Sequence, residues 1–156
     1  MSSVNWQRIL ASTDFSPFGN KAVNCAHELA EKFGAELHVV TVADSADVAA
    51  RQGGATGMLD PADASDERWK WLAELHGEKG TVKRFDAVLI GKNIAEKLAH
   101  YAKKHKIDLI VIASHGRTGL KHALLGSVAE KVIRSVHCPV LVLRPTAEEI
   151  AKSASK

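Results

Sequence analysis

The chain has 156 residues, of which 46% are apolar and 25% charged, which suits one globular domain with a sizeable core. Its formal net charge is +3, but charges of both signs are mixed along the chain, which argues against the clustered basic face of a nucleic-acid-binding protein. The first ten residues, MSSVNWQRIL, lack the apolar core of a signal peptide, and no apolar run reaches membrane-spanning length. We therefore expect a cytoplasmic protein without membrane insertion.

The first third of the chain predicts a strand, a helix and a second strand. A short apolar run over residues 9–12 predicts the first strand. Ser16 and Pro17 predict a helix start, with the hydroxyl as cap and proline in the first turn, and Gly34 predicts its C-terminal cap. Apolar residues recur between them at helical spacing, at Phe18, Ala22, Ala26, Leu29 and Phe33. A strand over residues 36–42 then completes a parallel crossover.

The segment 43–64 has a different composition. Small residues dominate, and glycines and a proline interrupt every period, at Gly53, Gly54, Gly57 and Pro61. We predict a long, mobile loop there. Ser65 or Asp66 then caps a short helix that runs through His76. Its predicted inward side is Trp69, Leu72 and Ala73.

Strands and helices continue to alternate in the second half. Residues 82–90 predict a third strand, and Asn93 predicts the cap of the next helix, with Glu96 three residues later. That helix has the apolar stripe Ile94, Leu98, Tyr101 and Ala102. The continuous apolar run 109–113 is typical of a strand that is covered on both faces.

The remaining elements complete one α/β domain. Another helix is marked by Val128, Val132 and Ile133. Residues 140–143 predict the last strand, and the polar tail 146–156 is expected to fray. The alternation predicts a single doubly wound domain over residues 1–145, with a mostly parallel sheet and helices on both faces.

Two segments carry the chemistry of a nucleotide site at the carboxyl ends of the strands. Thr13 and Asp14 follow the first strand, and a carboxylate there accepts hydrogen bonds from ribose hydroxyls. The glycine-containing segment 114–127 follows the fourth strand. Gly126 and Ser127 open a helix whose amides attract an anion; Ser127 either donates its hydroxyl or simply caps the helix. Glycines in such a segment also serve a turn alone, and neither common glycine-rich phosphate fingerprint is present.

The stretches ILASTDFS and IASHGRTGLKHALLGSVAEKVIRSVHCPVLVLRP resemble the universal stress protein family. The resemblance covers most of residues 7–145 and is weakest over 43–76. It implies a Rossmann-like, adenine nucleotide alpha hydrolase-like domain with a five-stranded parallel sheet. It also implies a homodimer formed by pairing of the last strands, here Val140 to Leu143.

The family includes ATP-binding members whose motif is glycine, two residues, glycine, nine residues, glycine, then serine or threonine. In this sequence the second and third glycines are Gly116 and Gly126, and Ala113 stands at the first. An alanine costs roughly 1–2 kcal/mol only if that site requires a positive φ. We therefore expect ATP binding to be retained, with Mg²⁺ held by phosphate oxygens and water.

The predicted nucleotide site consists of ten residues. The resemblance places Asp14 at the ribose, Val42 at adenine through its backbone, Ala113 near the ribose, and Gly116, Gly126, Ser127 and Val128 around the phosphates. Thr13, His115 and Arg117 join the predicted site because they lie in the same two segments. For His115 and Arg117 an ordinary surface or core role remains the alternative. Histidine spacing shows no metal site, because His100 and His105 share no helix face well.

These observations leave three classes of function. The first is an ATP-binding regulatory homodimer of the stress response, whose loop 43–64 orders over the nucleotide and signals to an unknown client protein. The second is a nucleotide-free stress protein that acts only through protein contacts, which Ala113 favours. The third is an enzyme; no general base stands beside the phosphate segment, so at most slow ATP hydrolysis or autophosphorylation is expected.

Overall fold

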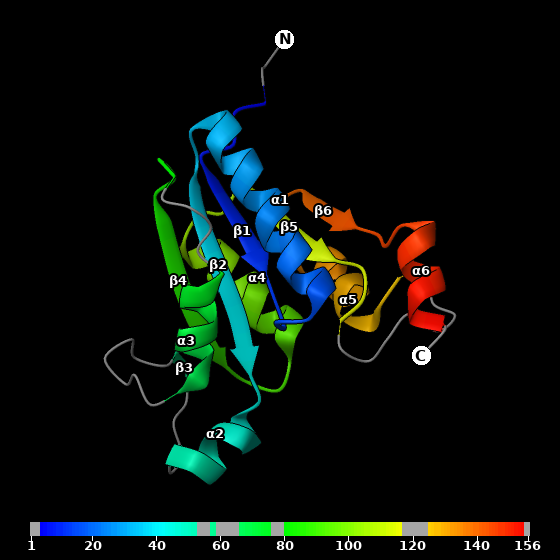
Figure 1. The fold of residues 1–156 in the computed structure, drawn as a ribbon. Helices are drawn as coiled ribbons and strands as arrows, with labels where there is room; N and C mark the ends of the chain where they lie inside the picture. Colours follow the sequence, from blue (N-terminus) through cyan, green and yellow to red (C-terminus); the bar gives the residue numbers. More distant parts are fainter. Residues whose placement is uncertain (1–3, 53–56, 59–65, 76–79, 117–124, 155–156) are drawn as a thin grey trace.

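The fold is that of a computed structural model, which describes residues 4–52, 57–58, 66–75, 80–116 and 125–154. Its centre is one sheet in the strand order β3-β4-β2-β1-β5-β6 (Figure 1). The strands are β1 (Arg8–Ser12), β2 (Glu36–Ala43), β3 (Gly57–Met58), β4 (Arg84–Ile90), β5 (Leu109–Ala113) and β6 (Val140–Leu143). Five of them run parallel, and only the two-residue β3 pairs antiparallel, with the end of β4.

The strand order reverses at β1. From this central strand the chain builds outward through β2 and β4 on one side, and later through β5 and β6 on the other. The carboxyl ends of β1 and β5 are therefore adjacent, with Ile9 beside Leu109 and Ala11 beside Val111. This arrangement confirms the predicted doubly wound fold and creates a switch point of the kind where such sheets bind ligands.

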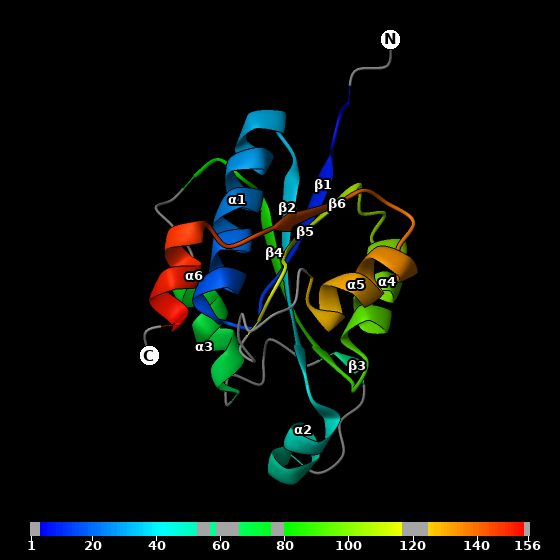
Figure 2. The same ribbon diagram turned by 90° about the vertical axis from the view of Figure 1, so that its right-hand side faces the viewer.

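Helices cover both faces of the sheet. The helices are α1 (Pro17–Phe33), α2 (Ser45–Gln52), α3 (Glu67–Glu74), α4 (Ile94–Lys104), α5 (Ser127–Ser135) and α6 (Ala147–Ala154). Figure 2 shows α1, α3 and α6 on one side of the sheet and α4 and α5 on the other. Two buried apolar clusters fill these layers, one with side chains of α1 and α3, the other with side chains of α4 and α5. None of the described helices is both long and apolar enough to cross a bilayer.

The predicted caps fix two of these helices. At α1, Ser16 has an extended backbone and its Oγ accepts the Gly19 N–H at 3.1 Å. Gly34 ends the helix at φ +64°, a left-handed conformation that favours glycine. At α4, the Asn93 side chain accepts the Glu96 N–H at 3.2 Å. Local sequence signals therefore set these helix boundaries as expected.

The segment 43–64 differs from the predicted loop. Ala43 extends β2, and Ser45–Gln52 form α2, at whose start Asp44 Oδ1 accepts the Ala46 N–H at 2.8 Å. The α2 side chain of Val48 is buried in the apolar cluster beneath α1. The prediction gave too much weight to the later glycines, although a short helix with one buried anchor can precede them. Most of the remaining segment lies outside the described residues.

The structure of the C-terminal tail and of α3 also differs from the prediction in some details. Residues Ala147–Ala154 form α6 rather than a frayed end, and Glu149 of α6 pairs with Lys21 of α1. Asp66 is the cap of α3, and Leu72 is fully buried as expected, but Ala73 is exposed. Such tertiary docking has no signal in local composition, because the partner surface is distant in sequence.

Candidate functional site

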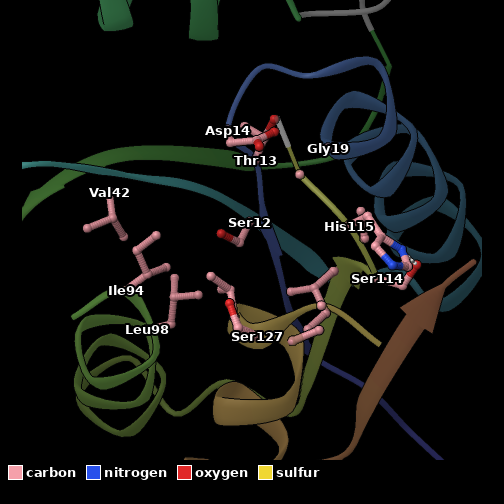
Figure 3. A pocket seen from close by; sticks show the side chains of 16 residues that line it. Ser12, Thr13, Asp14, Gly19, Val42, Ile94, Leu98, Ser114, His115 and Ser127 are labelled. Carbon is pink, nitrogen blue, oxygen red and sulfur yellow. Dashed lines mark hydrogen bonds between the residues drawn. The ribbon is translucent and has the colours of Figure 1, made fainter. Parts of the chain in front are cut away.

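A pocket of about 390 Å³ lies at the carboxyl ends of β1, β2 and β5, beside the first turns of α4 and α5 (Figure 3). Its volume falls in the ~300–1,000 Å³ range of small-molecule sites. It is lined by Ser12, Thr13, Asp14, Gly19, Val42, Ile94, Leu98, Ile112, Ala113, Ser114, His115, Gly116, Gly126, Ser127, Val128 and Ala129.

Nine of the ten predicted residues line this one pocket, whereas Arg117 lies outside the described residues. Ser114, which also lines the pocket, begins the predicted segment 114–127. The prediction did not place six lining residues in the nucleotide site: Ser12, Gly19, Ile94, Leu98, Ile112 and Ala129. Strand alternation carries a signal for two of them, because Ser12 and Ile112 are the last side chains of β1 and β5 on the face that α4 and α5 cover.

The turn between β1 and α1 holds Asp14 in place. Asp14 Oδ1 accepts the Ser16 N–H at 2.9 Å, and Thr13 Oγ1 accepts the Phe15 N–H at 2.9 Å. The Thr13 hydroxyl also donates to Asn20 Oδ1 at 3.1 Å. These bonds occupy the Thr13 side chain and orient the Asp14 carboxylate at the rim of the pocket.

Two glycines make room for that carboxylate. A Cβ at Gly19 would lie 2.7 Å from Asp14 Oδ1, and a Cβ at Gly116 would collide with Asp14 Oδ2. Gly116, which the sequence suggested for phosphate contact, therefore sits against the aspartate. The segment after β5 and the turn after β1 are thus fitted to each other across the switch point.

The start of α5 is left without a side-chain cap. The cap residue is Gly126, which has no side chain, and among the described residues no side-chain cap hydrogen bond is made to the first turn. Ser127 is the first helical residue, so of its two predicted roles the structure does not support the cap, and donation of its hydroxyl to an anion stays a prediction. Gly126 donates its N–H to the Ser114 carbonyl at 2.8 Å, and a Cβ on Gly126 would collide with that oxygen. The next amides have no partner within the helix, as at any helix N-terminus.

Ser114 and His115 form a buried pair beside α5. Ser114 Oγ and His115 Nδ1 are 2.8 Å apart, and Ser114 and His115 are 1% and 8% exposed. The Ser114 N–H donates to the Leu143 carbonyl at 2.8 Å, which ties the segment after β5 to β6. Figure 3 shows the pair on the β6 side of the pocket. The hydrogen bond to Ser114 fixes the orientation of the His115 ring.

Ala113 occupies an unstrained strand end. It pairs with Leu143 of β6 in regular parallel register. Among the described residues, the non-glycine residues with positive φ are Phe15 and Lys106, so Ala113 has a negative φ. Alanine at this position therefore carries no backbone penalty.

One side of the pocket is apolar. Val42 near the end of β2 faces Ile94 and Leu98 of α4, and Figure 3 shows these three side chains together, across the pocket from Ser114 and His115. The pocket thus combines an apolar wall, a carboxylate at the rim and an uncapped helix start. The apolar wall suits a planar apolar group, the carboxylate suits a group with hydroxyls, and the helix start suits an anion.

A second polar cluster lies nearer the amino end of β2. His38 Nδ1 is 2.9 Å from the Tyr101 hydroxyl, and its ring stacks on Phe85 at 4.9 Å. Burial, reinforced by nearby His105, lowers the pKa of His38 to about 4, and burial raises the pKa of Tyr101 to about 12. Both side chains are therefore neutral near pH 7 and belong to the core.

The described part of the chain holds no group of three histidine, cysteine or acidic side chains suited to a metal ion.

The fold and the pocket define a doubly wound α/β protein with a ligand-sized site at its switch point. A family model described as the universal stress protein family matches residues 5–144. Universal stress protein MJ0531 of Methanocaldococcus jannaschii is 34% identical in an alignment of 158 residues. The alignment covers 92% of this chain and 85% of that relative. The chain belongs to the universal stress protein family.

Solved structures share the fold. A universal stress protein in complex with cAMP matches with a TM-score of 0.62 and 23% identity, covering 90% of this chain and 98% of that one. The universal stress protein of Archaeoglobus fulgidus in complex with dAMP matches with a TM-score of 0.62 and 19% identity, covering 89% and 98%.

Proposed function

We propose that this protein binds an adenine nucleotide, ATP with Mg²⁺, in the switch-point pocket. The observation that carries the proposal is the meeting of Asp14 and the uncapped start of α5 in one pocket, although they are more than a hundred residues apart. The family membership and the cAMP and dAMP bound by two proteins of the same fold support it.

The nucleoside fits the end of the pocket near β1 and β2. The apolar wall of Val42, Ile94 and Leu98 suits the faces of an adenine ring. The Asp14 carboxylate, held by the Ser16 N–H, accepts hydrogen bonds from ribose hydroxyls. Because this turn is organised by its own hydrogen bonds, little ordering is needed on binding.

The phosphates fit the start of α5. This nine-residue helix presents first-turn amides from Ser127 onward and the positive end of its dipole. Gly126 has φ −69° and ψ 154°, which any residue adopts, so glycine is needed there for space: the missing Cβ lets the start of α5 lie against the Ser114 carbonyl. The described residues offer no acidic cluster for a cation, so Mg²⁺ would rely on phosphate oxygens and water.

The regulatory output would pass through a homodimer to a client protein. β6 is an edge strand of the sheet, and its Leu141 is 38% exposed. An unpaired edge of this kind readily pairs with a second strand, here the β6 of another copy. A nucleotide-free protein that acts through such contacts alone is the second candidate; Ala113 replaces the first motif glycine without backbone strain but adds a methyl group to the pocket lining.

The test is calorimetric titration of ATP with Mg²⁺ into the parent protein and two matched variants. Asp14→Asn keeps the acceptor for the Ser16 N–H and removes the charge that holds the ribose. Asp44→Asn makes the same change at an exposed aspartate that accepts the Ala46 N–H outside the pocket. We expect the first variant to bind about 10- to 150-fold more weakly, because hydrogen bonds to a charged group contribute ~1.5–3 kcal/mol.

The second variant should bind ATP like the parent. No heat from the parent at high micromolar concentration, together with no shift of its melting temperature, would refute nucleotide binding and leave the nucleotide-free candidate. Equal weakening by both variants would place the effect outside the pocket.

A further inference from the structure

Ser12 interrupts an otherwise apolar layer. On β1, Ile9 and Ala11 face the cluster under α1, whereas Leu10 faces the cluster under α4 and α5. Strand alternation places Ser12 on the same face as Leu10. The neighbouring strands end on this face with Val42 and Ile112, so a hydroxyl stands where both neighbours carry hydrocarbon.

The Ser12 hydroxyl makes no hydrogen bond to any described residue of the protein. Within the described part of the chain no hydrogen bond involves its side chain, unlike the hydroxyls of Thr13, Ser16 and Ser114 around it. Ser12 is half-buried, and Figure 3 shows its oxygen directed into the pocket, between Asp14 and the apolar wall. A polar group at such a place is satisfied by a ligand or by water that the ligand displaces.

Resting on the proposed function, we propose that the Ser12 hydroxyl donates a hydrogen bond to ring nitrogen N3 of the bound adenine. With the ribose at Asp14 and the ring faces against Val42, the edge of the base that adjoins the sugar is the edge turned toward Ser12. N3 is the free ring acceptor on that edge. Ser12 is thus a base-contacting residue of the nucleotide site, separate from the phosphate contacts at α5.

The experiment is a cycle of one variant and one ligand analogue. ATP and 3-deaza-ATP, in which a C–H replaces N3, are titrated into the parent and into Ser12→Ala. The parent should bind 3-deaza-ATP about 2- to 12-fold more weakly than ATP, the range of one hydrogen bond. Ser12→Ala should bind ATP more weakly by a similar factor and should not distinguish the two ligands.

Ser135→Ala is the matched control, because Ser135 lies on the exposed part of α5 and bonds only the Lys131 carbonyl. Ser12→Ala loses no hydrogen bond of the protein, so its melting temperature should not fall below that of the parent. The parent's preference between the two ligands tests the bond even if the variant folds poorly.

Three results overturn the inference. If the parent binds ATP and 3-deaza-ATP equally, N3 receives no bond. If Ser12→Ala keeps a full preference for ATP, another group makes that bond. If the parent binds neither ligand, the proposed function fails and this inference with it, which separates that failure from the first two.

Discussion

Two of the helices that begin beside the pocket, α1 and α5, start in different ways. α1 begins with Ser16, whose hydroxyl accepts the Gly19 N–H, followed by Pro17, which has no N–H to satisfy. α5 begins with Gly126, which has no side chain, and within the part of the chain that the structure describes no side-chain cap accepts its first-turn amides. One helix start is satisfied by the protein, and the other leaves its donors for solvent or a ligand.

This difference gives the two halves of the pocket opposite hydrogen-bonding characters. The start of α1 needs nothing further, so the turn before it can present an acceptor, the Asp14 carboxylate, and the nearby helix dipole favours that negative charge. The start of α5 presents donors. A ligand with hydroxyls at one end and an anion at the other matches both, which is the arrangement of a nucleotide.

The largest expected effect comes from filling the space at the start of α5. In Gly126→Ala the new Cβ collides with the backbone carbonyl of Ser114, which cannot move as freely as a side chain. We expect a loss of ~1–3 kcal/mol in the free energy of unfolding, as in other overpacked sites, and a loss of at least about tenfold in ATP affinity. Denaturant unfolding and calorimetric titration measure the two.

Gly91→Ala is the matched control for that variant. Gly91 also stands between a strand and a helix, but the nearest atoms to its added Cβ belong to the flexible Lys97 side chain rather than to the backbone. It should change ATP affinity little. If both variants weakened ATP binding equally, the open start of α5 would have no special part in binding.

A smaller effect is expected at the capped helix. Ser16→Ala removes the acceptor of the Gly19 N–H but leaves the Ser16 backbone N–H that holds Asp14. The free energy of unfolding should fall by about 1 kcal/mol, as for other N-cap substitutions. ATP affinity should stay close to that of the parent. An affinity loss as large as that of Gly126→Ala would contradict the contrast between the two helix starts.

The smallest effect is expected for Ser127→Ala. Ser127 is not the cap of α5, so removal of its hydroxyl should change the free energy of unfolding by no more than about 0.5 kcal/mol. A fall of about 1 kcal/mol in thermal or denaturant unfolding would show that the serine caps the helix after all. A fall in ATP affinity without a fall in stability would assign the hydroxyl to the phosphates.

Local patterns predicted those parts of the fold that depend on neighbours in sequence. The Ser16 cap, the Gly34 end and the Asn93 cap are as expected, because each joins groups within a few residues. The wrong assignments were the irregular segment that contains α2 and the frayed tail that forms α6. Each depends on a surface that the chain supplies far away in sequence.

By itself the sequence determined the alternation of strands and helices, the doubly wound class and the two segments that approach the pocket, because hydrophobic period and cap chemistry are local properties. Only the tertiary structure decided that Gly116 makes room for Asp14, that Ala113 lies in an unstrained strand and that Ser12 points into the pocket. These facts depend on distances between residues on different strands and helices, and such distances exist only once the sheet has formed.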